Sequence, residues 1–240
     1  MKAVLKALLA RTPYQVMRRV EANRFQAIES CLRSLRARGY RPRLVVDGGA
    51  HLGEFSLMAK RLFPDAALHL IEPQQACIDP LRRLCAAEGF VLHACALAEQ
   101  SGTLRFARTH EPSTGAQVAA PDNADTTDVT ACTLDELLGG AVGPDHRALL
   151  KLDLQGYELH ALKGGAGLLR SIEVVLTEVS FFMQSHASTI AALLAFMDEA
   201  GFQLDDIASL SARPRDNRAR EGDFVFVRRD SPLAQDRRWE

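Results

Sequence analysis

Short apolar runs alternate along the first half of the chain with stretches whose apolar residues recur about every 3.6 positions. The runs at 44–46, 67–71 and 90–95 are typical of buried parallel strands. The stretches between them, at 53–61 and 74–88, predict helices. Strands and helices in this order predict an α/β fold with a doubly wound, mostly parallel sheet and helices on both of its faces.

The second half of the chain continues this rhythm and then changes it. Apolar runs at 148–153 and 173–179 predict two more core strands, with a helix over 157–170 between them. A further helix is expected over 188–200. The last two strands, expected as an antiparallel C-terminal pair around an arginine-rich loop at 211–222, span 202–207 and 224–227.

The pattern divides the chain into three parts. Residues 1–40 form an N-terminal helical extension, with a helix over 14–38 that we expect to pack on the domain. An interfacial amphipathic helix is the alternative, because arginines flank its apolar residues. Residues 41–230 form the main domain, and 231–240 form a C-terminal tail.

A long polar loop interrupts the main domain. After a short extra strand at 103–107, residues 108–128 are rich in Thr, Ser, Pro, Gly and Asp and show little periodicity. A loop of this length inside a compact domain is either functional or mobile, and we expect it to be a lid over the acceptor. Thr133 then caps a helical turn, with Glu136 three positions on.

Composition narrows the classes of function. The 240 residues carry a formal net charge of -1, which disfavours a general electrostatic grip on nucleic acid. The five cysteines are scattered and odd in number, so neither a zinc site nor a disulfide framework is expected, and a reducing, cytoplasmic location fits. No run approaches the roughly 20 apolar residues of a transmembrane segment.

Carboxylates stand at the ends of four predicted parallel strands. They are Asp47, Glu72, Asp153 and Glu178. The carboxyl ends of parallel strands share one edge of a sheet, and ligands bind there in open α/β folds. A carboxylate at the end of an apolar strand also needs water, a partner or a ligand. The sequence therefore predicts a polar ligand site at this edge.

The first of these strand ends leads into a glycine-rich turn, Asp-Gly-Gly-Ala-His-Leu-Gly at 47–53. Its glycines allow a tight turn and a close approach to a ligand. The spacing departs from the G-x-G-x-x-G of nicotinamide sites, and an acidic residue before the glycines suits a cationic ligand such as S-adenosylmethionine. Glu72 would accept hydrogen bonds from two ribose hydroxyls. Taken alone, the turn is equally compatible with a plain βα connection.

The ordered motifs around these residues resemble the FkbM family of methyltransferases. They are 46–56 with the glycine turn, Ile71-Glu72-Pro73, Ala96-Leu97-Ala98-Glu99 with Ser101-Gly102, Leu150 to Glu158 with Lys151-x-Asp153-x-x-Gly156-x-Glu158, the segment 162–165, and Glu178. The resemblance covers roughly residues 40 to 228.

The resemblance implies a Rossmann-like class I methyltransferase sheet and O-methyl transfer from S-adenosyl-L-methionine to a sugar or polyketide hydroxyl. It implies that Asp47, Gly49 and Gly53 lie against the methionine part, that Glu72 reaches the ribose, and that the segment near Ala96 lies by the adenine. The family often carries Asn where this chain has His51. The predicted cofactor-binding residues are Asp47, Gly48, Gly49, Ala50, His51, Gly53, Glu72, Pro73 and Ala96.

Asp153 and Glu178 are the predicted catalytic residues. A carboxylate near the transferred methyl group can take the proton of a hydroxyl acceptor or orient that acceptor. Two alternatives stay open: both residues could hold a divalent metal, which we do not predict, or Asp153 could cap the next helix. Lys151 shares a strand face with Asp153 and is expected to pair with a carboxylate. Glu158 is expected to cap or pair, and His186 is a second candidate base.

The function expected from these residues is methylation of a hydroxyl on a glycan or a polyketide-like small molecule. We expect no nucleic-acid partner and leave open a homodimer. Polar residues of the predicted lid that suit a hydroxylated acceptor are Thr109, His110, Ser113, Thr114 and Gln117. A nicotinamide-dependent oxidoreductase and a non-catalytic subunit with the methyltransferase fold are the two alternatives.

Overall fold

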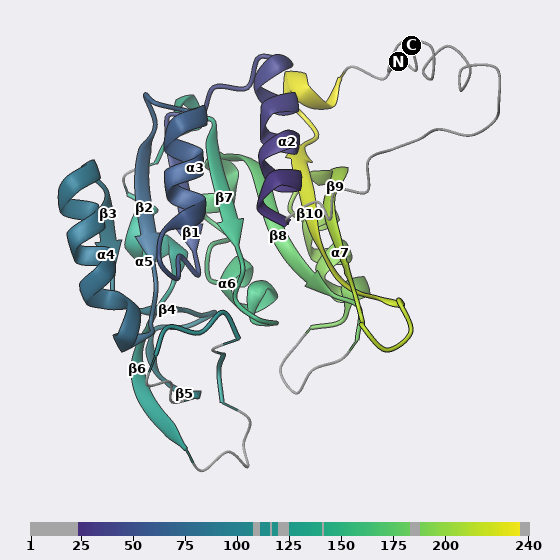
Figure 1. The fold of residues 1–240 in the computed structure, drawn as a ribbon. Coiled ribbons are helices and arrows are strands. Elements are labelled where there is room, and N and C mark those ends of the chain that lie inside the picture. The colour runs from purple at the N-terminus through teal and green to yellow at the C-terminus, as the bar shows by residue number, and fades with distance from the viewer. Residues whose placement is uncertain are drawn as a thin grey trace, which may run out of the picture.

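The computed structural model describes residues 24–107, 111–115, 117–119, 125–140, 142–182 and 188–235. The main strands are β1 (Leu44–Gly48), β2 (Ala67–Ile71), β3 (Val91–His93), β7 (Ala148–Leu152), β8 (Ile172–Ser180), β9 (Phe202–Ala212) and β10 (Ala219–Arg228). They form a seven-stranded sheet in the order β3-β2-β1-β7-β8-β10-β9 (Figure 1). β10 runs antiparallel to its two neighbours, β8 and β9, and all the other neighbouring strands of this sheet are parallel. The predicted doubly wound sheet with an antiparallel C-terminal pair is therefore confirmed.

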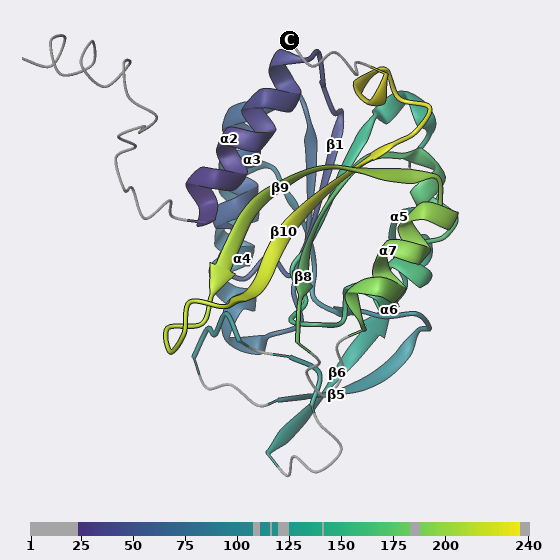
Figure 2. The same cartoon turned by 90° about the vertical axis from the view of Figure 1, so that its right-hand side faces the viewer.

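Helices cover both faces of this sheet. They are α2 (Arg24–Ala37), α3 (Glu54–Leu62), α4 (Gln75–Glu88), α5 (Leu134–Leu138), α6 (Glu158–Lys163) and α7 (Ile190–Glu199), with single turns η1 (Pro144–His146), η2 (Leu168–Ser171) and η3 (Pro232–Ala234). Figure 2 shows α2, α3 and α4 on one side of the sheet and α5, α6 and α7 on the other.

Alternate strand residues serve two separate hydrophobic cores. Val45 and Leu149 pack with α2, α3 and α4, whereas Val46 and Leu150 pack with α5, α6 and α7. Successive strand side chains point to opposite faces, so a strand covered on both faces must be apolar throughout. This explains why the core strands were recognisable as unbroken apolar runs.

Three segments differ from the predicted pattern. The helix expected over 157–170 ends at Lys163, because three glycines follow within four positions and a glycine inside a helix costs about 1 kcal/mol. The loop expected over 108–128 is shorter, since β6 (Thr126–Cys132) begins inside it. The arginine-rich loop is also shorter than 211–222, because β9 and β10 extend to residues 212 and 219.

A second, small sheet lies on the side of the molecule that holds the glycine turn. It contains β4 (Ala96–Leu97), β6 and β5 (Gly102–Ala107), in the order β4-β6-β5 (Figure 1). β5 was expected as a short extra strand, but β6 was not. Only Ala131 of β6 is buried, so its sequence shows no apolar face. The predicted cap of α5 is confirmed, since the Thr133 side chain accepts from the N–H of Glu136 at 3.1 Å.

The N-terminal helix belongs to the packed body of the protein. Ile28, Leu32 and Leu35 of α2 are buried in the same core as α3, and α2 also contacts β9. The part of this helix expected before Arg24 lies outside the described residues, and the division of the chain at residue 40 stays a prediction. Across the described segments, no helix combines the length and apolarity needed to cross a bilayer.

We predict that Gly49, in the turn after β1, tolerates no side chain. Its φ is +73°, and a Cβ would lie 2.0 Å from the carbonyl oxygen of Asp153. Gly89 has the same φ of +73°, but a Cβ there meets nothing within 4 Å. Gly89→Ala should therefore lose about 1 kcal/mol of unfolding free energy from left-handed strain alone. Gly49→Ala should lose more than about 3 kcal/mol, because the clash is added. Equal losses in urea unfolding would contradict this.

Candidate functional site

A cavity of about 500 Å³ opens at the carboxyl ends of β1, β2, β7 and β8. This volume is in the range of sites for drug-sized ligands. Most of the predicted site residues line it: Gly49, Ala50, His51, Glu72, Pro73, Ala96, Asp153 and Glu178. Asp47, Gly48 and Gly53 do not, and they lie behind the wall or under the following helix.

Asp47 is fully buried and already has two partners. Its Oδ1 accepts from Nζ of Lys151 at 2.8 Å, and its Oδ2 accepts from Oγ of Ser56 at 2.7 Å. The expectation that Lys151 pairs with a carboxylate is thereby confirmed. Nζ also donates to the carbonyls of Gly48 and Gly49, at 3.1 and 2.7 Å. Burial lowers the pKa of Lys151, but Asp47 and Asp153 outweigh it and raise the pKa overall, so the residue stays charged.

The glycines of the turn make room for protein rather than for a ligand. A Cβ on Gly53 would lie 2.3 Å from the Leu84 side chain, and one on Gly48 would lie 2.8 Å from Leu152. The backbone positions that reach the cavity are those of Gly49, Ala50 and His51.

Glu72 fixes the far side of the turn. Its Oε2 accepts from the N–H of His51 at 2.8 Å, and its Oε1 accepts from the N–H of Gln74 at 2.9 Å. Burial raises the pKa of Glu72 against the opposing effect of these hydrogen bonds. A carboxylate offers about four lone-pair directions, so each oxygen can accept a second hydrogen bond from a ligand in the cavity.

His51 lines the same cavity and carries an unpaired polar atom. Its Nε2 is buried and has no hydrogen-bond partner within the described parts of the chain. Buried polar atoms in native proteins are nearly always paired, so this nitrogen calls for a partner from a bound molecule. The residue has φ of +49°, a left-handed conformation in which both His and Asn are enriched.

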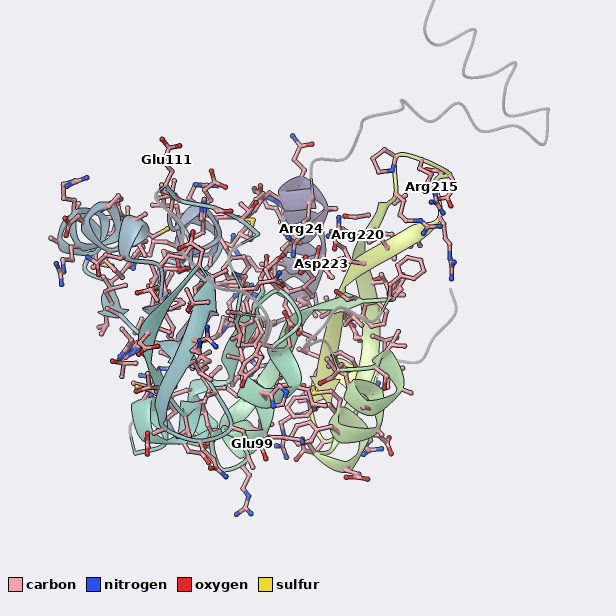
Figure 3. All side chains as sticks on the ribbon, turned by 90° about the horizontal axis from the view of Figure 1, so that it is seen from below. Arg24, Glu99, Glu111, Arg215, Arg220 and Asp223 are labelled. Atoms are coloured by element: carbon pink, nitrogen blue, oxygen red, sulfur yellow. The ribbon has the colours of Figure 1, made fainter. Side chains whose placement is uncertain are left out.

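The opposite end of the cavity holds three carboxylates around one arginine. Arg24 contacts Asp153 through Nη1 at 3.0 Å, Glu178 through Nη2 at 3.1 Å, and Asp223 through Nε and Nη2 at 2.8 and 2.6 Å. Figure 3 shows Arg24 of α2 beside Asp223 of β10, with Arg220 close by. Gln155 adds a bridge, since its Nε2 donates to Asp153 at 3.0 Å and to Glu178 at 3.1 Å.

These contacts and burial shift the pKa values of the two predicted catalytic carboxyls in opposite directions. Burial raises the pKa of Asp153, but Lys151, Arg24 and the hydrogen bond from Gln155 outweigh that effect and lower its pKa overall. Burial and the charge of Asp153 raise the pKa of Glu178 to about 9 despite Arg24. At neutral pH the site therefore holds an ionised Asp153 beside a protonated Glu178.

Glu158 caps the turn that follows Asp153. Its Oε1 accepts from the N–H groups of Leu154 at 2.7 Å and Gly156 at 3.2 Å, and burial raises its pKa to about 7. The expectation that Glu158 caps or pairs is confirmed. The capping interaction considered for Asp153 is thus made by Glu158, and Asp153 keeps its place on the cavity wall.

Several residues of the predicted lid reach the cavity, Gly115 and Val118 among them. Ser113 and Thr114 line it, and Ser113 exchanges two hydrogen bonds with Gln74, at 3.0 and 3.1 Å. Gln117 is described but does not line the cavity. The other predicted residues here, Thr109, His110 and His186, lie outside the described residues.

Two residues of the cluster, Arg24 and Asp223, were not predicted. Asp223 precedes an apolar run, whereas each of the predicted carboxylates stands at the end of one. Because β10 is antiparallel to β8, its beginning lies at the edge where β8 ends, and Asp223 pairs in register with Glu178. Strand direction was the signal that could have found it. Arg24 pairs with residues up to 199 positions away, so no local pattern marks it.

A sequence model described as the Methyltransferase FkbM domain matches residues 47–204. The chain belongs to this family. This confirms the resemblance drawn from its motifs and favours a methyltransferase over the nicotinamide alternative. The methyltransferase sdnD of Sordaria araneosa is 31% identical over 155 residues, which cover 50% of this chain and 59% of that protein. The chain therefore matches less than two thirds of the length of this relative.

Solved methyltransferase structures match the chain at low identity. Methyltransferase FkbM from Methylobacillus flagellatus KT has a TM-score of 0.48 and 16% identity, over 76% of this chain and 43% of that one. Magnesium protoporphyrin IX methyltransferase (ChlM) from Synechocystis PCC 6803, solved with bound SAM, has a TM-score of 0.48 and 11% identity, over 95% and 96%. The mostly parallel sheet with a helical layer on each face is the Rossmann-like arrangement predicted from the sequence.

We expect the stability of this FkbM-family chain to fall as the pH rises through the neutral range. An acid whose pKa is higher in the folded than in the unfolded state binds more protons when folded, so the unfolding free energy falls between the two pKa values. For Glu178 this window runs from its ordinary 4.5 to about 9, and for Glu158 it ends at about 7. The slope is on the order of 1 kcal/mol per pH unit for each proton.

Substitution separates the two contributions. Glu178→Gln should flatten the decline over the whole window, whereas Glu158→Gln should flatten it only below about pH 7. Denaturant unfolding at pH 5 to 9 measures both. A wild-type stability that rises between pH 7 and 9, or a Glu178→Gln variant that declines as steeply as the wild type there, would show the assignment to be wrong.

Proposed function

We propose that this FkbM-family protein is an S-adenosylmethionine-dependent O-methyltransferase that acts on a hydroxyl of a glycan or polyketide-like small molecule. One observation carries the proposal. A single cavity is lined by His51, whose Nε2 has no partner among the described residues, by Glu72, whose oxygens can each accept a further hydrogen bond, and by an ionised Asp153. The first two suit a nucleoside cofactor, and the third suits a neutral hydroxyl acceptor.

The residues at the β1 and β2 ends fit the cofactor. Glu72 can accept hydrogen bonds from two ribose hydroxyls while it holds the turn, and His51 Nε2 is free to bond a polar group. Ala96 and Pro73 add apolar wall suited to a flat base. Asp47 acts from behind this wall, since its partners Lys151 and Ser56 fix the turn. When bound, the cofactor supplies an electrophilic methyl group on a positively charged sulfur.

Asp153 handles the proton of the acceptor. Its carboxylate accepts a hydrogen bond from the hydroxyl and so orients the oxygen. As that oxygen forms its bond to the methyl carbon, the carbon–sulfur bond breaks and the hydroxyl proton passes to Asp153. A carboxylate of lowered pKa is a weak base, so the proton moves late, when bonding to carbon has made the oxygen strongly acidic. Orientation contributes the rest of the rate enhancement.

Cofactor binding tests the first half of this proposal. Calorimetry should detect binding of S-adenosylmethionine to the wild type, and Glu72→Ala should weaken it at least about tenfold, the loss of roughly one charge-assisted hydrogen bond. Glu99→Ala is the control, because Glu99 lies outside the cavity and pairs with the exposed Lys163. Absence of wild-type binding, or equal affinities of both variants, would refute this assignment.

Methyl transfer tests the second half. With a panel of glycan and small-molecule hydroxyl acceptors, Asp153→Asn should lower kcat by about 100-fold or more, because Asn keeps the shape but cannot take a proton. Cofactor affinity should stay within about threefold of the wild type. Formation of S-adenosylhomocysteine measures the turnover. A wild type that binds the cofactor but methylates no acceptor would instead favour the non-catalytic subunit.

A further inference from the structure

The residues that line the cavity come from two parts of the chain: the segment that matches the family and the segments that flank it. The turn, Glu72 and Asp153 lie within residues 47–204, the part that matches the family. Arg24 on α2 and Asp223 on β10 lie outside it, on either flank. Figure 3 shows these two residues side by side, between the N-terminal helix α2 and the C-terminal hairpin of β9 and β10. The end of the cavity opposite the cofactor turn thus depends on a contact between the two flanks.

The cluster concentrates negative charge in a buried place. The side chains of Glu178 and Asp223 are 5% and 4% exposed and lie directly opposite each other on neighbouring antiparallel strands. Like charges opposite each other in a sheet are destabilising. Asp153 is 20% exposed and adds a third carboxyl. A proton on Glu178, the guanidinium of Arg24 and the nearby ammonium of Lys151 offset the charge of this group.

Arg24 is committed to these carboxyls and is not free to bind an anionic acceptor. Of its five N–H donors, the one on Nε and those on Nη2 meet Asp223 and Glu178, and Nη1 meets Asp153. The planar guanidinium presents its donors to these carboxyls at fixed angles, whereas a lysine ammonium is a compact charge whose three donors rotate. The arrangement therefore holds carboxylates in place, and it leaves the Asp153 oxygen that Arg24 does not contact to Gln155 and the cavity.

We propose that Arg24 is a positioning residue for the methyl acceptor. It keeps Asp153 ionised and fixes the direction of its carboxylate, while it ties Asp223 and Glu178 into one support. The inference rests on the proposed function, since Asp153 has to meet a hydroxyl for the position to matter. The titratable and charged groups around Asp153 are Lys151 of β7, Arg24 of α2, Glu178 of β8 and Glu158 of α6, with Asp223 of β10 joined to them through Arg24.

Kinetics of Arg24 variants in the full chain test the proposal. Arg24→Ala should lower kcat at pH 7 at least tenfold, leave the cofactor affinity within threefold, and shift the acid limb of the kcat–pH profile upward by at least one unit. Arg24→Lys keeps the positive charge but lacks the planar guanidinium. Its kcat–pH profile should therefore lie closer to that of the wild type than its kcat does. Arg38→Ala is the matched control, because Arg38 directly follows the last residue of the same helix and pairs with Asp205 away from the cavity.

Further measurements keep the outcomes distinct. If Arg24→Ala does not fold, Arg24→Ala with Asp223→Asn removes one charge along with its partner, and it should show the same kinetic changes. Loss of kcat in Arg24→Ala with an unshifted pH profile and matching loss in Arg38→Ala would overturn the positioning role. If the wild type transfers no methyl group, the proposed function fails by itself. Unfolding between pH 3 and 7 then still tests the charge effect, because the stabilisation by ionised Asp153, lost as the pH falls, should be smaller in Arg24→Ala than in Arg38→Ala.

Discussion

The buried pair between Lys151 and Asp47 is the interaction on which the site depends. The two residues face each other in register on the central strands β1 and β7, and both are buried. A buried charge that loses its partner costs several kcal/mol, so each holds the other in place. Because Nζ also binds the carbonyls of Gly48 and Gly49, the pair sets the path of the turn where it enters the cavity. The ligand-facing backbone is thus fixed from behind.

The other buried acids of the site are satisfied in three different ways. Glu72, after β2, accepts backbone N–H groups, and Glu158, after β7, does the same, so both act as structural acceptors. Asp153 is held ionised by cations, whereas Glu178 retains a proton. Environments that push the pKa values of neighbouring carboxyls apart allow one to accept a proton while the other stays neutral. The different protonation states of Asp153 and Glu178 therefore follow from the small number of cations that these buried acids share.

The sequence allowed the fold and much of the cavity wall to be predicted, for a common physical reason. Parallel strands buried on both faces are apolar until they end, so Asp47, Glu72, Asp153 and Glu178 stood out as strand ends on one edge. The pattern could not tell which of them face the ligand, because burial behind the wall depends on side-chain partners such as Ser56. It also missed β6, whose polar residues show no apolar face.

Arg24 and Asp223 show where such prediction ends and why. A residue's place at the sheet edge follows from strand direction, and the antiparallel β10 reverses the rule that found the other acids. An ion pair between residues of the two flanks leaves no periodic pattern in the sequence. The requirement for a cation becomes apparent only when the structure brings the carboxyls together. The same geometry gives the flanks a separate part in the site. If the central segment binds the cofactor, a change at either flank alters the charge around Asp153 while the Lys151–Asp47 pair and the cofactor turn stay as they are.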